Sequence, residues 1–527
     1  MIHSKACLPL WLASTALVLS GCNHHDDDND DHGGPNTSMQ VYATKVVKCD
    51  SGDQPETGLQ GQVPAALRTG FKGFNCNLEV VGQYRGQGGN WSSAQFKSAG
   101  RFCAYHSTAT PVAGRENPGV PVINISDPTH PTRTTSLTST AMLDPWESLR
   151  VNQRRALLYA DFGTNSAGGP DFDVYDLSGD CTNPQLMSTV KLSYLTNVPG
   201  SSTAPINGHE GAISPDGLTY YVGDLTNGKY HAVDVSNPSR PRVIATYDIK
   251  ANSPIAKTPH GLSVSKDGNR AYVVALATPT QADAADPAYA QNGFLVLDTS
   301  EVQARKPDAQ MRVISSTAFR DGSYAQHTIT TRIGGKSYLV MVDEGGSAGL
   351  ADAGNARLAC SQNLAPFPMA RIYDMSDEKR PQLVSKLGLE THDPKNCDAV
   401  LPDIAGLSIF TYGSHYCSVD NLENSTAMAC SYFNSGIRVF DIRDPAHPKE
   451  IAYYNPPGQT TPVLGSNHVT FQQWRAGGPD WCASRLDFDK ASRTLTTMCQ
   501  DNGLLVMKFK NGVWPFDNSP VAEEDED

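Results

Sequence analysis

The sequence predicts an all-β protein, a seven-bladed β-propeller of four-stranded antiparallel blades closed by an N-terminal strand that completes the last blade. Three observations lead to this fold class. A short motif with the pattern of a β-strand recurs seven times, and three further runs with a strand pattern surround its copies. The last copy lacks an outer strand, and the N-terminal region supplies one. We expect the propeller to occupy residues 40–511.

The recurring phrase is an apolar-alternating strand that ends in Asp and continues into a turn. Its copies lie at 122–128, 174–178, 233–238, 296–300, 372–376, 439–445 and, in degenerate form, 504–509. From position 124 to position 508 the copies are about 64 residues apart on average, which exceeds the roughly 40 to 50 residues of a plain four-stranded blade. Some blades must therefore carry inserted loops.

The third copy shows the complete four-strand unit. The runs Gly211–Ile213 and Thr219–Val222 flank the turn Ser214–Gly217, and the phrase and a fourth run, Arg242–Thr246, follow. Pro-Asp-Gly between alternating runs is typical of a β-hairpin. An array of β-sandwiches is the alternative, but it would not repeat one four-strand unit seven times.

Ring closure can be predicted from the two ends of the repeat region. The last copy has its third strand at 503–510, and little chain follows it. The run Leu78–Tyr84 has the pattern of an outer strand and precedes the first strand of the first blade, near 91–96. We therefore expect Leu78–Tyr84 to complete the seventh blade, so that both ends of the ring are tied together.

The first 21 residues have the features of a bacterial export signal. Lys5 precedes an apolar run, Ala6–Leu19, that is too short to span a membrane. The sequence Leu19-Ser20-Gly21-Cys22 resembles the lipobox of bacterial lipoproteins, and this implies that Cys22 is lipidated and becomes the mature N-terminus. Because Asn23 rather than Asp follows, the resemblance implies delivery to the outer membrane of a Gram-negative bacterium, facing the periplasm or the cell surface. An ordinary signal peptide with a chance cysteine is the alternative.

The charge of the chain is concentrated in two acidic tails. The acidic runs 26–31 in the tether (22–39) and 523–527 in the C-terminal tail (512–527) carry ten acidic side chains between them. Removing these and Lys5 leaves 45 acidic and 41 basic side chains, although the whole chain has a net charge of −13. The net charge of −13 argues against a nucleic acid as partner. We expect the membrane to be contacted through the lipid anchor alone.

Ten cysteines remain after Cys7 leaves with the signal and Cys22 takes lipid, an even number that suits disulfides in an exported protein. Sequence cannot fix the pairing of all ten. Hairpin-like separations favour Cys417 with Cys430 and Cys482 with Cys499, and Cys360 and Cys397 stand in neighbouring insertions. A metal cluster is the weaker alternative, because Cys-x-x-Cys does not occur.

The repeated phrase, Val-x-Asp-x-Ser-x-Pro-x-x-Pro in its full form, is similar to that of LVIVD-repeat proteins, which are exported bacterial β-propellers. The resemblance covers roughly residues 75–510, and its most specific part is 414–417 with 435–445. Asn124 and Lys508 depart from the phrase where Asp is expected, which affects blade boundaries rather than architecture. The family implies the fold and export, and it implies no established activity.

One structural position carries polar side chains in five successive blades. When the first strands are aligned on their apolar alternation, a ligand-type residue stands two positions before the first aligned apolar residue. These residues are Glu147, His209, His260, His327 and His415. Because first strands converge on the propeller axis, the five side chains are expected to face one another. Imidazoles with a carboxylate suit one transition metal, Fe or Cu, and also Zn or Mn. A ring of histidines bound only to neighbouring backbone is the alternative.

Long insertions are predicted on the face that carries these histidines. They lie between second and third strands at 277–292 and 344–368, and between blades at 388–414 and 456–480. Long loops grouped on one face usually build a binding surface or a lid. A Cys360–Cys397 bridge would fix part of this lid, and His468 could reach the ring from another part. An envelope protein or a small molecule would bind here.

Two functions follow from the sequence. The first is a membrane-anchored envelope propeller that acts as a binding or scaffold protein. The second is a metal-dependent (Fe or Cu) oxidoreductase or oxygenase with a four-histidine site on the axis, which is similar in architecture to the carotenoid-cleaving oxygenases but lacks their motifs. Motifs of serine hydrolases, nucleotide-binding loops and zinc proteases are absent from the sequence. A Ca²⁺-assisted, lactonase-like hydrolase would use Glu147 and other channel carboxylates.

Overall fold

A computed structural model describes residues 48–98, 100–108, 116–161, 172–192, 206–278, 291–461, 463, 466 and 478–516. All of these residues belong to one compact unit, 37–527. The predicted signal peptide (1–21), the tether (22–39), Cys22, His468 and the tail beyond residue 516 lie outside the described residues.

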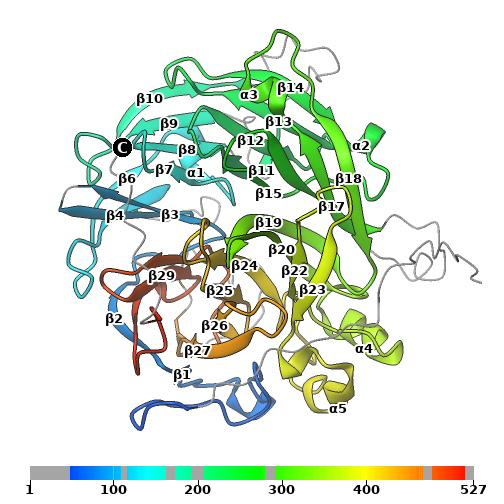
Figure 1. Cartoon of the computed structure of the whole chain (residues 1–527). Coiled ribbons are helices and arrows are strands. Elements are labelled where there is room, and N and C mark those ends of the chain that lie inside the picture. Colours follow the sequence, from blue (N-terminus) through cyan, green and yellow to red (C-terminus); the bar gives the residue numbers. More distant parts are fainter. Residues whose placement is uncertain are drawn as a thin grey trace, which may run out of the picture. The chain divides into compact units, whose positions relative to one another are not determined.

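Seven antiparallel sheets follow one another along the chain, and their successive colours run around a ring in Figure 1. Blade 1 comprises β3 (Ser93–Ser98), β4 (Arg101–His106), β5 (Val120–Asn124) and β6 (Thr132–Leu137). Blade 2 comprises β7 (Arg150–Asn152), β8 (Leu157–Asp161), β9 (Phe172–Asp176) and β10 (Gln185–Val190). Blade 3 comprises β11 (Gly208–Ile213), β12 (Thr219–Asp224), β13 (Lys229–Asp234) and β14 (Arg242–Asp248). Blade 4 comprises β15 (Leu262–Val264), β16 (Arg270–Ala275), β17 (Asn292–Asp298) and β18 (Arg312–Phe319).

Blades 5 and 6 each include one additional strand, and blade 7 takes its outer strand from the N-terminal region. Blade 5 comprises β19 (Ser323–Ile333), β20 (Lys336–Gly346), β22 (Ala370–Asp374) and β23 (Gln382–Leu387), with the short β21 (Gly349–Leu350) beside β20. Blade 6 comprises β24 (Ser414–Val419), β25 (Ala427–Tyr432), β26 (Gly436–Asp441) and β27 (Lys449–Asn455), with β1 (Phe74–Cys76) added at its outer edge. Blade 7 comprises β28 (Asp487–Asp489), β29 (Thr494–Cys499), β30 (Gly503–Phe509) and β2 (Leu78–Tyr84).

The N-terminal clasp is confirmed. Strand β2 pairs antiparallel with β30 and forms the outer edge of blade 7, over the residues that the sequence predicts. Strand β1 pairs with β27 in the preceding blade, so the N-terminal region is paired into two blades. The clasp therefore ties the two ends of the ring through backbone hydrogen bonds, which removes open sheet edges.

The recurring phrase is the third strand of each blade, and its Asp has a structural role. The Oδ1 atom of Asp234 accepts a hydrogen bond from the backbone N–H of Ser236 at 3.0 Å. The same bond to the residue two positions on is made by the phrase residues Asn124, Asp176, Asp298, Asp374 and Asp441. An Asx turn of this kind starts the connection to the fourth strand. Asn124 makes the same bond, so the departure from Asp does not alter the blade.

The hydrophobic core is divided among the interfaces between neighbouring blades. Each of seven buried apolar clusters combines side chains from two adjacent sheets, for example blades 3 and 4 or blades 5 and 6. The second strands β8, β12 and β25 are buried along their whole length. Their sequences are accordingly rich in Tyr, Val, Leu and Ala, because both faces of each sheet contact another blade.

Short helices lie in the connections between strands. They are η1 (Ala65–Leu67), α1 (Thr140–Leu143), α2 (Ile249–Asn252), α3 (Ser300–Gln303), α4 (Ala353–Ser361), η4 (Glu390–His392), η5 (Pro394–Asn396) and α5 (Cys397–Val400). Helix α4 lies in the predicted insertion 344–368, and η4, η5 and α5 lie in 388–414. The Cys360–Cys397 disulfide joins the two insertions. No helix of the described residues is long and apolar enough to cross a membrane.

Five disulfides account for the ten cysteines of the propeller. The structure contains the three pairs that the sequence favours, Cys360–Cys397, Cys417–Cys430 and Cys482–Cys499. Cys417 and Cys430 stand directly opposite each other on β24 and β25. The other two pairs, Cys49–Cys76 and Cys103–Cys181, join segments whose proximity only the fold reveals.

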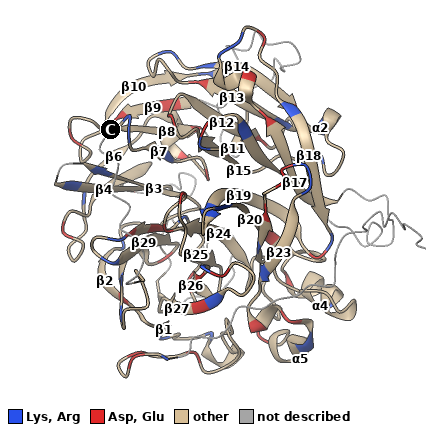
Figure 2. Ribbon diagram, viewed as in Figure 1, with Lys and Arg blue, Asp and Glu red and all other residues tan. Residues whose placement is uncertain are grey.

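Lys and Arg are interspersed with Asp and Glu over the blades in Figure 2, as the near-balanced charge of the body predicts.

Candidate functional site

Three blades position a polar residue by the same backbone irregularity at the start of the first strand. In β11, β19 and β24 the register of pairing to the second strand skips one residue, which is His209, Gln326 and His415 respectively. Such a β-bulge leaves the extra residue out of the ladder and redirects its side chain. First strands of neighbouring blades contact one another from blade 1 to blade 6, so the redirected side chains meet.

These side chains and that of His260, which precedes β15, converge on one carboxylate. The Nε2 atoms of His209 and His260 lie 3.5 and 3.7 Å from Glu147 Oε2, and His415 Nε2 lies 3.2 Å from Glu147 Oε1. Gln326 donates from Nε2 to Glu147 Oε2 at 3.1 Å. We call these five residues together with Glu344 the axial cluster.

A second carboxylate, Glu344 at the end of β20, completes the cluster. Its Oε2 atom lies 3.3 Å from His415 Nε2, and its Oε1 atom lies 3.9 Å from His260 Nε2. The side chains of His209 and Glu344 retain 12% and 11% exposure, whereas those of Glu147, His260 and His415 retain 3% or less. Solvent therefore reaches the cluster only from the side of His209 and Glu344 within the described part of the chain.

The orientation of two imidazoles is fixed by their other ring nitrogen. His415 Nδ1 lies 2.6 Å from the carbonyl oxygen of Ala483, and His260 Nδ1 lies 3.0 Å from that of Gln326. A carbonyl oxygen only accepts, so Nδ1 carries the proton in both rings. In the neutral form of each ring, Nε2 then presents its lone pair to the carboxylates, the arrangement typical of metal-ligating histidines.

Charged side chains contact His260 on the side of its Nδ1 atom. Glu210 Oε2 lies 3.4 Å from His260 Nδ1, and Glu210 Oε1 is held by Arg150 at 3.0 Å and Arg485 at 2.6 Å. Burial raises the pKa of the Glu210 carboxyl, but His260 and the two guanidinium groups outweigh burial and lower it. Glu210 is therefore ionised and is placed as a carboxylate partner of the histidine.

The imidazoles of the cluster differ in protonation when no metal is bound. Burial disfavours the charged form of each ring, but Glu147, Glu344 and Glu210 outweigh burial and raise the pKa of His260 to about 9. At His415, Glu147 and Glu344 likewise outweigh burial and raise the pKa of the imidazole to about 10. Burial and the neighbouring His260 hold the pKa of His209 well below its usual value. Two cationic imidazoles therefore face the carboxylates at neutral pH.

The prediction that His327 belongs to the ring is wrong. Its Nδ1 atom bonds to Gln326 Oε1 at 2.9 Å, its Nε2 accepts from the backbone N–H of Cys417 at 3.5 Å, and its ring stacks on Tyr416. Burial lowers the pKa of His327 to about 3, so the ring is neutral. The bulge in β19 falls one residue earlier than the aligned apolar pattern implies, and Gln326 occupies the position expected for the histidine.

Aromatic rings cover the cluster on one side. Trp91, Trp146, Phe410, Phe433 and Trp481 belong to one apolar group. The ring centres of Trp91 and Phe433 lie 5.2 Å from that of His415, and the ring centre of Trp146 lies 5.8 Å from that of His209. Trp146 has a φ of +45° and Phe410 a φ of +52°, a left-handed conformation that is uncommon for aromatic residues. Such strain often accompanies functional sites, and here it adjoins Glu147.

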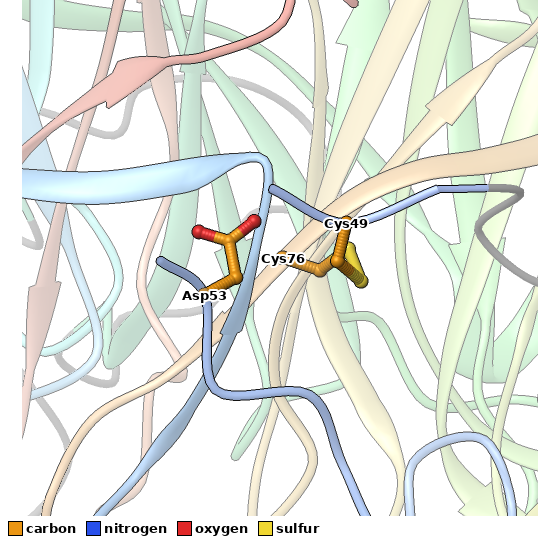
Figure 3. A group of neighbouring side chains, drawn as sticks. All are labelled: Cys49, Asp53 and Cys76. Atoms are coloured by element: carbon orange, nitrogen blue, oxygen red, sulfur yellow. A yellow bond between two sulfur atoms is a disulfide. The ribbon is translucent and has the colours of Figure 1, made fainter. Parts of the chain in front are cut away.

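Another group of potential ligands, Cys49, Asp53 and Cys76, has a different explanation. The two sulfur atoms are bonded to each other as a disulfide, as Figure 3 shows, so neither is a free thiolate. The carboxylate of Asp53 accepts from Lys510 Nζ at 2.8 Å and from the backbone N–H of Asn77. This group anchors the N-terminal segment. It offers a metal ion only the carboxylate of Asp53, which already accepts these hydrogen bonds.

Comparisons with known proteins find solved structures that match the chain at low identity, and no curated protein matches it. A candidate 6-phosphogluconolactonase of Bacteroides uniformis is 13% identical, over 77% of this chain and 92% of that chain, with a TM-score of 0.48. The periplasmic gluconolactonase of Pseudomonas aeruginosa is 12% identical over 75% and 93%, with a TM-score of 0.42. A β-propeller domain of Myceliophteria thermophila is 10% identical over 82% and 98%, with a TM-score of 0.44.

The seven blades and their closure place the chain among the β-propeller proteins. Residues 220–249 match the LVIVD repeat model, and they span β12, β13 and β14 of blade 3. The chain is thus a seven-bladed β-propeller whose third blade matches the LVIVD repeat model. The similarity to the solved structures concerns the fold alone and carries no statement about activity.

Proposed function

We propose that the protein is an exported, lipid-anchored propeller of the cell envelope that binds one divalent transition metal ion in the axial cluster. The observation that supports this proposal is the convergence of three Nε2 atoms on the Glu147 carboxylate at 3.2–3.7 Å. Two ligand atoms that hold one ion at 2.0–2.2 Å lie about 3.3–3.6 Å apart along a tetrahedral edge. The spacing in the cluster is close to this range.

The ligands would be Glu147, His209 and His260, whose ligand atoms lie within 4.8 Å of one another, and His415 and Glu344 are placed beside them to complete the coordination or to hold a metal-bound water. Three imidazoles and a carboxylate suit Fe(II), Cu(II), Zn(II) or Mn(II). A bound ion would supply Lewis-acid or, for Fe and Cu, redox chemistry. The chain itself fixes the two Nδ1 atoms, excludes water through the aromatic cover and leaves access beside Glu344.

Metal analysis of the purified full-length chain tests the proposal. Mass spectrometry of the eluted metal, before and after incubation with Fe(II), Cu(II), Zn(II) or Mn(II) and removal of the excess, should find about one ion per chain. His260→Ala and His415→Ala should lose most of this metal. His231→Ala is the matched control, because His231 is equally buried and is also paired with a carboxylate, Asp224, but lies outside the cluster.

Two results would overturn the metal site. One is a wild-type chain that keeps less than about a tenth of an ion after every incubation. The other is a metal content that falls equally in the His231→Ala control.

A binding or scaffold protein without metal is the second candidate. The observation that favours it is the charge balance of the cluster, in which His260 and His415 face Glu147 and Glu344 as ion pairs. A buried network of this kind can be satisfied without a metal ion. Metal analysis distinguishes the two functions, because a metal-free chain of unchanged stability supports the scaffold.

The cell-envelope location is part of the same proposal and is supported by the sequence 19–22 and its flanking residues. Lipidation of Cys22 and a polar tether would hold the propeller at the outer membrane. The insertions joined by the Cys360–Cys397 disulfide would then form the surface for an envelope protein or a small molecule.

A further inference from the structure

A pocket of about 660 Å³ lies away from the axial cluster, at the other end of the first strands. Its lining includes Gln95 and Lys97 from β3 and Asp487 and Asp489 from β28, with Asn421 from the turn that follows β24. Lys97 and Asp489 stand at the ends of their strands, whereas the cluster residues stand at or before the strand starts. The volume is in the range of small-molecule sites in proteins.

One carboxyl of the pocket lining, that of the partly buried Asp487, has an oxygen without a partner. Asp487 Oδ2 is inaccessible to solvent and has no hydrogen-bond partner. Burial raises the pKa of Asp487 to about 7, against the opposing effect of Arg485. Leaving such a group unsatisfied lowers the stability of the folded state, so a native protein usually provides it with a partner.

Three other charged groups of the pocket are engaged within the protein. Lys97 Nζ lies 3.5 Å from Asp489 Oδ1. Asp420 accepts from Thr426, from the backbone N–H of Ala427 and from Trp514 Nε1. The lining also includes Lys490, so two basic side chains, Lys97 and Lys490, stand against Asp420 and Asp489, and the pocket presents little net charge to a ligand apart from Asp487.

Amide and aromatic groups complete the lining. The Oδ1 atom of Asn421 accepts two backbone N–H groups, which leaves its own N–H groups as donors. The rings of Phe488 and Trp514 lie 5.0 Å apart at the pocket wall, and Trp514 is fixed by its bond to Asp420. A smaller hollow of about 220 Å³ shares Lys97 and Asp489 with the pocket and extends along blades 1 and 7.

We propose that this pocket binds an uncharged, hydroxyl-rich ligand, a monosaccharide or a short oligosaccharide, with Asp487, Gln95 and Asn421 as its hydrogen-bonding groups. Each sugar hydroxyl both donates and accepts, so a carboxyl beside two amides satisfies several at once. The apolar C–H faces of a sugar ring fit the aromatic wall. The adjoining hollow provides room for a second sugar unit. This site is independent of the metal proposal.

Saturation-transfer NMR and calorimetry on the full-length chain test the proposal. The probes are glucose, galactose, N-acetylglucosamine, maltose and cellobiose, with choline and spermidine as cationic probes. At least one sugar should bind saturably. Asp487→Leu should weaken that binding at least tenfold, whereas Asp487→Asn, which keeps the hydrogen bonds, should change it less than about threefold.

Glu79→Leu is the matched control, since it makes the same kind of change on the exposed outer strand of the same blade and should leave binding unchanged. Thermal midpoints check that the variants fold, and Gln95→Leu, with an expected tenfold loss, replaces Asp487→Leu if that variant does not. The proposal is overturned if none of the sugars binds, or if binding survives both leucine substitutions in the pocket. Binding of the cations alone, lost in Asp487→Asn, would also overturn it.

Discussion

The stability of the metal-free protein should fall steeply between pH 7.5 and 9.5 because of the axial cluster. His260 and His415 have folded-state pKa values of about 9 and about 10, both above the 6.5 of an unfolded histidine. The stabilisation that accompanies a raised pKa is fully present below pH 6.5 and is lost as pH rises through the folded-state value. The buried carboxyls Asp161, Asp343 and Asp487 have pKa values of about 7 and contribute little to the change above pH 7.5.

The size of the effect follows from these values. One pKa unit corresponds to 1.36 kcal/mol, and integration over this window gives a loss of about 2 kcal/mol for each of the two histidines. Both rings are at least 98% buried, so solvent screening reduces the effect little. The free energy of unfolding should therefore be about 4 kcal/mol lower at pH 9.5 than at pH 7.5.

Urea unfolding of the chelator-treated full-length chain at pH 7.5, 8.5 and 9.5, followed by tryptophan fluorescence, measures this loss. Glu147→Gln removes the carboxylate that both imidazoles face and should at least halve the slope. His130→Gln, on an exposed turn, should leave the slope unchanged. Stability that is constant or rises over the window, or a slope that Glu147→Gln does not alter, would refute the assignment of two cationic imidazoles.

Three further predictions concern the anchor, the clasp and a disulfide. Cys22→Ser should give a chain that is no longer lipid-labelled or membrane-associated on cell fractionation; a processed, lipid-labelled variant would contradict the lipobox assignment. Gly82→Val should lower the thermal midpoint, because a Cβ at this position would stand 1.9 Å from the carbonyl oxygen of Pro128; an unchanged midpoint would contradict the packing of β2 on blade 1. Replacing both Cys103 and Cys181 by Ala should cost about 4 kcal/mol of stability in denaturant unfolding, since their bridge closes a long loop between blades 1 and 2; a loss under about 1 kcal/mol would exclude that cross-link.

The sequence by itself determined the architecture. Alternating strands, Asx turns and hairpin turns are encoded within a few residues, so seven copies of one unit and a missing outer strand were sufficient to predict seven blades and the clasp at Leu78–Tyr84. Three disulfides followed for the same reason, because their cysteines lie in one hairpin or in neighbouring insertions. Three of the four histidines predicted for the ring, and Glu147, were also brought together.

Only the tertiary structure decided the composition of the site. A β-bulge adds one residue without changing the apolar alternation on either side of it, so the sequence could not show that Gln326 rather than His327 faces Glu147. Ile329 of blade 5 packs against the following blade 6, whereas Ile213 of blade 3 packs against the preceding blade 2. This difference marks the shift, and only contacts between blades show it. Glu344 comes from a second strand, where no shared position marks it, and Asp487 meets Gln95 and Asn421 only because three blades converge. Local pattern sets the direction of each side chain, but which side chains meet depends on where distant strands are placed.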